Sequence, residues 1–306
     1  MSPVRECPPP VALAREEPDA HLLLDDHRAS CSLWWRRTPE HEGQRVGAIG
    51  HFAAADAESG AALLAAACAR LAARGCRLAV GPMDGNTWRN YRLVLERGEE
   101  PPFFLEPDSP AYWPQCFARA GFSAAATYCS SVQENLRFED RRLQLVERRA
   151  AQAGVRIRNL DLANPGHDLA DIHEIALAAF AGAYLFSPIE RGEFIAQYAR
   201  ILPQVRPELV LIAEQGGAPL AFAFGVPDAF EPARGTTVIL KTVATRPGLA
   251  YAGLGHLLVA HGARDAAALG FRRVVHALMQ DTNRSLAWSA AYGRVFRRYA
   301  LLSRTL

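Results

Sequence analysis

The sequence has almost no lysine. Of its 34 basic residues, only Lys241 is a lysine, and the others are arginines. Enrichment in arginine and alanine is typical of a GC-rich genome and says little about function by itself. The basic residues form no block, and 32 acidic residues bring the formal net charge to +2. The charge pattern therefore argues against a nucleic-acid partner.

Patterns typical of membrane, metal and disulfide proteins are also missing. The sequence contains no run of about 18 apolar residues, so we expect no membrane span or membrane partner. Residues 1–10 are polar and proline-rich, which predicts no signal peptide. The six cysteines form no CxxC pair and show no metal spacing with histidine. We therefore expect no metal, and reduced, mostly buried thiols in a cytoplasmic protein.

The length of 306 residues corresponds to about two domains, and the first half alternates between strand and helix patterns. Asp56 and Gly75 supply start and stop signals for an amphipathic helix over residues 57–73. A second helix is predicted over residues 88–96, opened by Asn86 or Thr87. The predicted strands of this half are 20–24, 30–35, 46–52, 77–80 and 123–132.

The second half repeats the later part of that order, which indicates duplication of one fold. Residues 134–154 are charged and predict a linking helix that ends at Gly154, so we place the domains at 1–150 and 151–306. Strands are predicted at 155–160, 209–214, 219–226, 236–245, 272–278 and 295–304. Helices are predicted at 169–181, 190–201, 253–269 and 283–291. This mixture is a mixed α/β pattern.

The stretch from Thr236 to Leu258 carries the clearest chemical signal. A β-branched strand runs into a short turn, and a helix then opens with Gly253 and Gly255. The start of a helix offers unpaired N–H groups and a positive dipole end, which together bind phosphate without a basic side chain. The two glycines let the backbone approach a ligand closely. The alternative is a closely packed strand–turn–helix without a ligand.

This stretch resembles the coenzyme A loop of the GNAT acyltransferase superfamily, which reads V-x-P-x-x-[RQ]-x-x-G-x-[GA]. Pro247, Gly253 and Gly255 match that pattern, whereas Thr245 and Ala250 depart from it. The order of the predicted elements over residues 155–306 is also similar to that of the family. The resemblance implies an α/β (α+β mixed-sheet) fold class, two tandem GNAT-like acyl-CoA N-acyltransferase folds, and acetyl-CoA or another acyl-CoA as cosubstrate.

The resemblance also implies where the acyl-CoA binds. The residues concerned are Val243, Ala244, Thr245, Ala250, Tyr251, Ala252, Gly253, Leu254, Gly255, His256 and Asn283. Asn283 is explained equally well as a simple helix cap. The tyrosine that the family places seven residues after this asparagine is Ala290 here. Tyr292 is therefore the candidate general acid, with a role as a core residue as the alternative.

Two further side chains are candidates for acyl-transfer chemistry. Glu214 ends a predicted strand and is a candidate general base, with an exposed turn carboxylate as the alternative. Lys241 lies mid-strand on the same face as Val243. It is a candidate contact to substrate or phosphate, with a surface lysine as the alternative.

The first half resembles the same fold but lacks the loop. Residues 53–55 are alanines where the glycines would lie, and Asp56 at the helix start would repel phosphate. We interpret this half as a degenerate copy that no longer binds coenzyme A, an arrangement similar to that of mycothiol synthase-like enzymes. Arginines and aromatic residues after its fourth strand predict a pocket for an anion or an acyl chain, with a small satellite core as the alternative. The substrate-binding candidates are Asp84, Asn86, Trp88, Arg89, Arg92 and Phe104.

These features predict an enzyme of the acyltransferase class, acetyltransferase-like, that transfers an acyl group from acyl-CoA to the amine of a small molecule. Such a ternary-complex reaction needs positioning more than a protein nucleophile, which fits the absence of a Ser/His/Asp set. Two alternatives stay open. One is a non-catalytic protein that binds or senses acyl-CoA or an acyl carrier protein, and the other is an O-acyltransferase.

Overall fold

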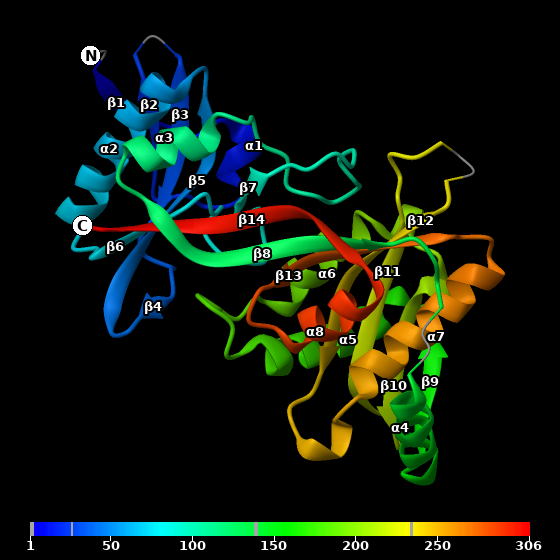
Figure 1. The fold of residues 1–306 in the computed structure, drawn as a ribbon. Coiled ribbons are helices and arrows are strands. Elements are labelled where there is room, and N and C mark those ends of the chain that lie inside the picture. The colour runs from blue at the N-terminus through cyan, green and yellow to red at the C-terminus, as the bar shows by residue number, and fades with distance from the viewer. Residues whose placement is uncertain (1–2, 26, 138–139, 233–234) are drawn as a thin grey trace.

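A computed structural model of the chain describes residues 3–25, 27–137, 140–232 and 235–306. Its strands form one continuous sheet, with the first half of the chain at one end and the second half at the other (Figure 1). Helices pack on both faces of this sheet. The expected mixed α/β class is confirmed.

The first half contains the five predicted strands and the helix over residues 57–73, together with further elements that the sequence did not indicate. Its elements are β1 (Val4–Cys7), α1 (Val11–Ala14), β2 (Ala20–Leu24), β3 (Ala29–Trp34), β4 (Glu40–His41), β5 (Gln44–Ala54), α2 (Ala57–Ala73), β6 (Leu78–Gly81), β7 (Leu93–Glu96), α3 (Trp113–Arg119) and β8 (Ser123–Gln133). Asp56 caps α2 by accepting a hydrogen bond from the backbone N–H of Ser59. Gly75 follows the helix at φ +82°, as the stop signal predicted.

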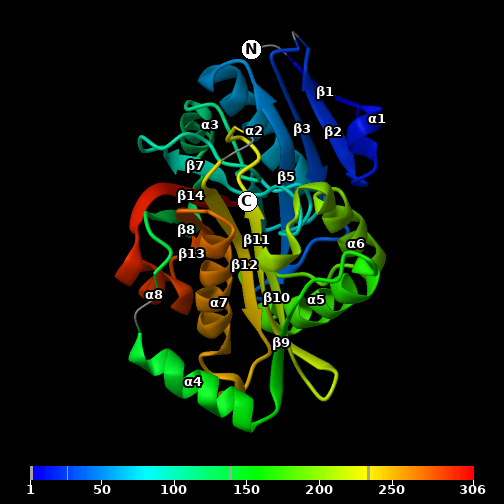
Figure 2. The same cartoon turned by 90° about the vertical axis from the view of Figure 1, so that its right-hand side faces the viewer.

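The second half supplies the other six strands of the sheet among the described residues. Its elements are α4 (Arg141–Gln152), β9 (Val155–Asn159), α5 (Pro165–Phe180), α6 (Arg191–Ala199), β10 (Val210–Gln215), β11 (Ala218–Pro227), β12 (Thr237–Thr245), α7 (Leu254–Ala268), β13 (Arg273–Gln280), α8 (Arg284–Tyr292) and β14 (Arg294–Thr305). Short 3-10 turns lie at Leu202–Gln204, Pro207–Leu209 and Leu249–Tyr251. Figure 2 shows α5 and α6 on one face of β10–β12 and α7 on the other.

The helix predicted over residues 88–96 is wrong. The side chain of Asn86 accepts a hydrogen bond from the N–H of Trp88 and so forms a tight turn instead of a helix cap. The indole of Trp88 donates to the carbonyl of Ser187 at 2.7 Å, and Arg92 takes a positive φ of +72°. Contacts with the second half therefore override the local helical pattern, and β7 follows directly.

The two halves exchange their last strands. β8, the last strand of the first half, pairs only with β13 and β14 of the second half. β14, the last strand of the second half, pairs with β6, β7 and β8 of the first half. Figure 1 shows β8 and β14 side by side between the two ends of the sheet. The proposed boundary at residue 150 is thus crossed by strand pairing in both directions.

The cysteines take part in packing. All six are free, and all except Cys7 are buried. Burial raises the pKa of the Cys68 thiol to about 11, which makes it a poor nucleophile. No helix formed by the described residues is long and apolar enough to cross a membrane.

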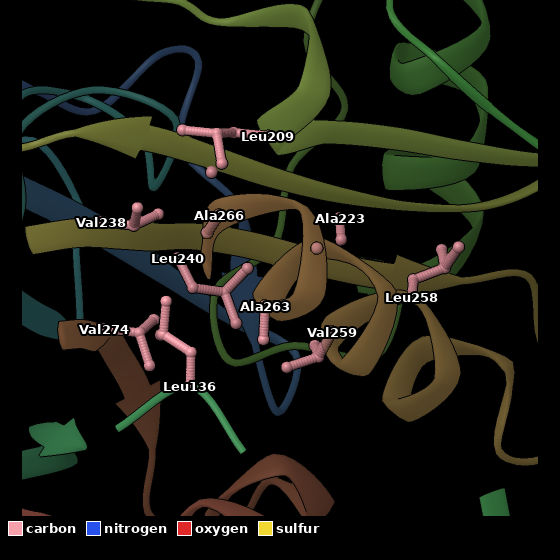
Figure 3. A pocket seen from close by; sticks show the side chains of 12 residues that line it. Leu136, Leu209, Ala223, Val238, Leu240, Leu258, Val259, Ala263, Ala266 and Val274 are labelled. Atoms are coloured by element: carbon pink, nitrogen blue, oxygen red, sulfur yellow. The ribbon is translucent and has the colours of Figure 1, made fainter. Parts of the chain in front are cut away.

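A small apolar void lies between α7 and the sheet (Figure 3). Its volume is about 30 Å³, and side chains such as Leu240, Ala263 and Val274 line it. This space corresponds to about one water molecule, and its apolar walls offer water no hydrogen-bond partner. Gly262 of α7 contributes to the void, and a Cβ there would meet only Leu211 Cδ1, at 3.5 Å. The void is a packing defect and is too small to bind a ligand.

Replacing Gly262 with alanine should stabilise the protein by about 1 kcal/mol, because alanine favours the helix and fits the free space. Chemical denaturation followed by circular dichroism measures this change. Gly60 in α2 is the matched control, since a Cβ there would lie 2.6 Å from Cys116 Sγ. Gly60→Ala should therefore destabilise by about 1–3 kcal/mol. Equal effects of the two substitutions would contradict this account of the packing.

Candidate functional site

The second half of the sheet opens between two parallel strands. β12 and β13 pair from Thr237 and Arg273 up to Leu240 and His276. Beyond that point β13 is irregular, with Leu278 at φ +58°. Among the described residues, 242–245 of β12 pair only with β11, and Lys241 lies at a register shift between the two strands. One edge of β12 therefore lies open in the interior of the sheet.

A cavity of about 940 Å³ lies at this opening, and both halves of the chain form its walls. Six residues that the sequence singled out line it. They are Trp88, Arg89, Arg92, Lys241, Val243 and Asn283. Asn283 precedes α8, and its side chain makes no capping hydrogen bond. Asn283 thus occupies the N-cap position of α8 without a capping hydrogen bond from its side chain.

Lys241 is a partly buried cation in the cavity wall. Burial and, second, the charge of Arg92 lower the pKa of its ammonium group to about 8. Among the described residues, no carboxylate lies within ion-pair distance of it. The lysine is charged in most molecules at neutral pH, in a place where its charge is poorly compensated.

Arg92 brings a second cation into the same cavity from the first half. Its side chain is 9% exposed, and its guanidinium carbon lies 3.9 and 4.1 Å from the ring centres of Tyr91 and Tyr128. Nη1 donates to the carbonyl of Leu278 at 3.2 Å. The two rings and the carbonyl fix the guanidinium, and Leu278 lies on β13 just past the opening.

The carboxylates that line the cavity already have partners. Among the described residues these pairs are Glu16 with His51, Glu17 with Arg37, Glu106 with Arg297, and Glu193 with Arg89. Burial raises the pKa of Glu106, although Tyr299 and Arg297 both hydrogen-bond to it. These carboxylates are held in fixed pairs, in contrast to the two cations.

The other side of the opening is the start of α7. Gly253, the N-cap residue, precedes the helix at φ +89° and has no side chain that could cap the first turn. A Cβ on Gly255 would lie 3.1 Å from Thr245 Oγ1 and 3.2 Å from Val243 Cγ1. Glycine thus lets the helix start pack directly on the end of β12.

The remaining loop candidates surround this helix start. Ala250 and Tyr251 lie in the 3-10 turn before α7, and Ala252 is exposed. Ala244 is buried against β11, and Leu254 packs in the core below α7. The loop predicted from the sequence is therefore assembled at one end of β12, and only Val243 of its residues lines the cavity itself.

His256 and Tyr292 lie together, with their ring centres 6.4 Å apart. Burial lowers the pKa of His256, with opposing contributions from the charges of Asp140 and Arg142. Neither ring lines the cavity. Tyr292 is therefore placed beside the first turn of α7 and away from the cavity wall.

Three other candidates have structural partners outside the cavity. Glu214 accepts from Arg158 Nε at 2.8 Å, in a network that also holds Asp168. The N–H of Phe104 donates to Asp228, and Asn86 forms the turn described above. None of the three lines the cavity.

Asp84, the remaining candidate, fills the corresponding opening in the first half. β5 and β6 are parallel only from Val46 to Ala48. Beyond that, the N–H of Met83 donates to the carbonyl of Ile49 at 2.8 Å, and Asp84 Oδ1 accepts from the N–H of His51 at 2.6 Å. Burial raises the pKa of Asp84. In the first half, Met83 and Asp84 therefore fill the space beside β5. In the second half, the equivalent space beside β12 is open.

Several cavity residues could not be singled out from the sequence. Tyr128 lies in a strand, and Glu106 and Glu193 lie in segments whose position across the cavity depends on the packing of the two halves. Of these three residues, only Glu106 could have been suspected from the sequence, because it lies in a loop rich in proline and phenylalanine. Tertiary arrangement, which a single sequence does not encode locally, brings these residues together.

No family model matches the chain, and no curated protein matches its sequence. Solved structures share its fold. A GCN5-related glucosamine N-acetyltransferase region of a fungal multi-domain β-N-acetylglucosaminidase has a TM-score of 0.55 and 10% identity. That match covers 96% of this chain and 34% of the other, so this chain spans about a third of that protein.

Two further similar structures are comparable to this chain in length. A GCN5-related N-acetyltransferase from Sphaerobacter thermophilus has a TM-score of 0.53 and 13% identity, over 94% of this chain and 80% of the other. A tandem GNAT protein from the clavulanic acid biosynthesis pathway has a TM-score of 0.52 and 13% identity, over 100% of this chain and 90% of the other. The chain has a tandem GNAT fold.

Proposed function

We propose that the chain is an acyltransferase that moves an acyl group from acyl-CoA to the amine of a small molecule. The observation that carries this proposal is the opening between β12 and β13, with the large cavity on one side and the uncapped start of α7 on the other. An extended thioester fits this passage, with its phosphates at the helix start and its acyl group towards the cavity.

The residues present fit an acyl-CoA in the second half only. The N–H groups of Leu254 and Gly255 would hold phosphate at the first turn of α7. The first half offers no such place, because Asp56 occupies the start of α2 and Asp84 fills the opening beside β5. One acyl-CoA per chain is therefore the expected stoichiometry.

The proposed reaction is a direct transfer. The amine nitrogen attacks the acyl carbonyl carbon, the new C–N bond forms, and the C–S bond breaks. The amine gives up a proton, and coenzyme A leaves as a thiol. The open edge of β12 and the cavity walls supply positioning, which can lower the barrier of a reaction between two bound substrates by about 7–11 kcal/mol. Glu214 has no part in this scheme, because Arg158 holds it elsewhere.

One observation favours the alternative of a non-catalytic sensor. The described carboxylates that line the cavity are all engaged with cations or histidine, so none is an evident general base. A protein that binds acyl-CoA without turnover would need no such base. Release of free thiol from acetyl-CoA in the presence of a panel of amines distinguishes the two functions.

Replacing Ala252 with glutamate should weaken acetyl-CoA binding by about tenfold or more, because its carboxylate would compete with phosphate at the start of α7. The same charge favours the helix itself, so loss of folding is not expected. Isothermal titration calorimetry with acetyl-CoA measures the effect. Ala268→Glu, at the exposed far end of α7, is the control and should change Kd less than about twofold.

The outcome that contradicts the proposal is clear. If acetyl-CoA and longer acyl-CoAs produce no binding heat and no shift in Tm with the unmodified protein, the acyl-CoA site does not exist. If they bind and Ala252→Glu binds equally well, the phosphates lie somewhere other than the start of α7.

A further inference from the structure

We infer that the acceptor is an amine that also carries an oxyanion, a carboxylate or a phosphate, and that Arg92 and Lys241 bind this group inside the cavity. This inference rests on the proposed acyl transfer and specifies its second substrate. Anion binding itself can be measured without acyl-CoA, so the two proposals can fail separately.

The first part of this subsite is Arg92. The residue as a whole is 9% exposed, and the guanidinium donates one N–H to Leu278 while the rings of Tyr91 and Tyr128 lie over it. A buried charge is costly unless it is paired. Among the described residues, no carboxylate lies within ion-pair distance of it. The remaining N–H groups form a planar fork that suits an oxyanion.

The second part is Lys241. It lies on β12, one residue beyond the last β12–β13 pair, and it lines the same cavity as Arg92. The two cations are close enough for the charge of Arg92 to disfavour the ammonium form of Lys241. Two like charges held close together without an anion repel each other, and a bound oxyanion between them would remove that repulsion.

The surrounding charges support a site for an anion and not one for a cation. The nearby carboxylates that line the cavity are engaged within the protein, Glu16 by His51 and Arg15, and Glu17, Glu106 and Glu193 by Arg37, Arg297 and Arg89. Among the described cavity-lining residues, Arg92 and Lys241 are therefore partly or fully buried cations without an ion pair, whereas Arg200 at the rim is exposed to solvent. Because Arg92 and Lys241 come from the two halves and flank the opening of β12, a bound oxyanion would lie at the junction with the proposed acyl-CoA passage.

The first experiment measures binding of glutarate, without acyl-CoA, to the full chain in Tris buffer free of other multivalent anions. Glutarate should raise Tm, and the neutral analogue glutaramide should not. Lys241→Met and Arg92→Gln should each weaken glutarate binding at least tenfold. Arg200→Gln, which removes a solvent-exposed cation from the rim of the same cavity, should change it less than threefold.

The second experiment follows thiol release from acetyl-CoA with matched acceptors. β-Alanine and 2-aminoethyl phosphate carry the oxyanion, whereas β-alanine methyl ester lacks it. We expect kcat/KM to be at least tenfold higher for one or both anionic acceptors than for the ester, and Lys241→Met should bring this ratio close to one. The comparison of β-alanine with aminoethyl phosphate identifies the preferred oxyanion.

The results that would overturn the inference are equally specific. One is that glutarate and inorganic phosphate both leave Tm unchanged while acetyl-CoA binds normally. Another is that Arg200→Gln weakens glutarate binding as much as Lys241→Met does, which would mean general charge attraction and no defined subsite. If Arg92→Gln fails to fold, Lys241→Met decides the question, with acetyl-CoA binding as its test of folding.

Discussion

Replacing Lys241 with methionine is expected to stabilise the folded protein while it removes most of the activity towards anionic acceptors. Methionine keeps the volume of the side chain and removes a poorly compensated charge from the cavity wall. A shift of one pKa unit corresponds to about 1.4 kcal/mol, so we expect a gain of about 1–3 kcal/mol at pH 7. The loss in kcat/KM should be about 10- to 100-fold, the range for a hydrogen bond to a charged group.

The pH dependence of this gain has a defined sign. The pKa of Lys241 is about 8 in the folded protein, compared with the usual 10.5. Between these values the unfolded chain still holds a proton that the folded chain has lost, so the stability of the unmodified protein rises with pH. The Lys241→Met variant lacks this contribution. Its advantage should therefore shrink from about pH 8 upward and be nearly lost above about pH 10.5.

Urea denaturation between pH 7 and 10 measures both effects. Lys241→Arg is the matched control, because it keeps the charge in the cavity and should gain no stability. A structural lysine would behave in the opposite way, since its removal would reduce stability. A less stable Lys241→Met with unchanged acceptor kinetics would show that Lys241 has no functional role.

Residues 1–150 and 151–306, expressed separately, should not fold into stable proteins. β8 finds its strand partners only in the second half, and β14 only in the first. Each half alone would leave its last strand unpaired, and in the first half β6 would keep β5 but lose β14 as a partner. Circular dichroism with thermal unfolding of each piece, and of the two mixed, measures this dependence. Cooperative unfolding of the isolated first piece would contradict it.

Point substitutions in β14 also test whether the core of the first half depends on this strand. Leu302 pairs opposite Gly81 of β6 and is buried in the core of the first half. Leu302→Ala should cost about 2–4 kcal/mol, although the residue belongs to the second half of the sequence. Val295 on the same strand is 39% exposed, and Val295→Ala should cost less than about 1 kcal/mol. Similar losses for the two would mean that β14 does not hold the first core together.

The sequence predicted elements well where local signals agree with the final structure. Helix α2 was predicted with its observed bounds, because the capping aspartate, the helical spacing and the terminal glycine all indicate the same ends. The prediction of a helix over residues 88–96 was wrong, because the conformation of this segment depends on contacts with Ser187 and Leu278, which are far away in the sequence. The exchange of β8 and β14 has no local signature at all.

In the candidate site, too, local sequence signals predicted some features, whereas contacts between distant residues determine others. Periodicity and glycine spacing identified the strand, turn and helix from Thr236 to Leu258, and the structure brings these together at the opening. The unusual position of the one lysine indicated Lys241, and the cluster of arginines and aromatics indicated Arg92. The partners that engage Glu214 and Asp84 could not be read from spacing, because they come from other strands and loops.

The exchange of last strands has a consequence for how the protein is made. The first half emerges from the ribosome before β14 has been synthesised. Without β14, the first half cannot complete its part of the sheet. At about 5–20 residues per second, the remaining 150 or so residues take roughly 10–30 s to synthesise. During that time the edge of β6 and both edges of β8 are exposed, and such edges invite aggregation. A chaperone that shields nascent strands should therefore raise the yield of folded protein more for this chain than for a tandem protein whose halves each keep their own last strand.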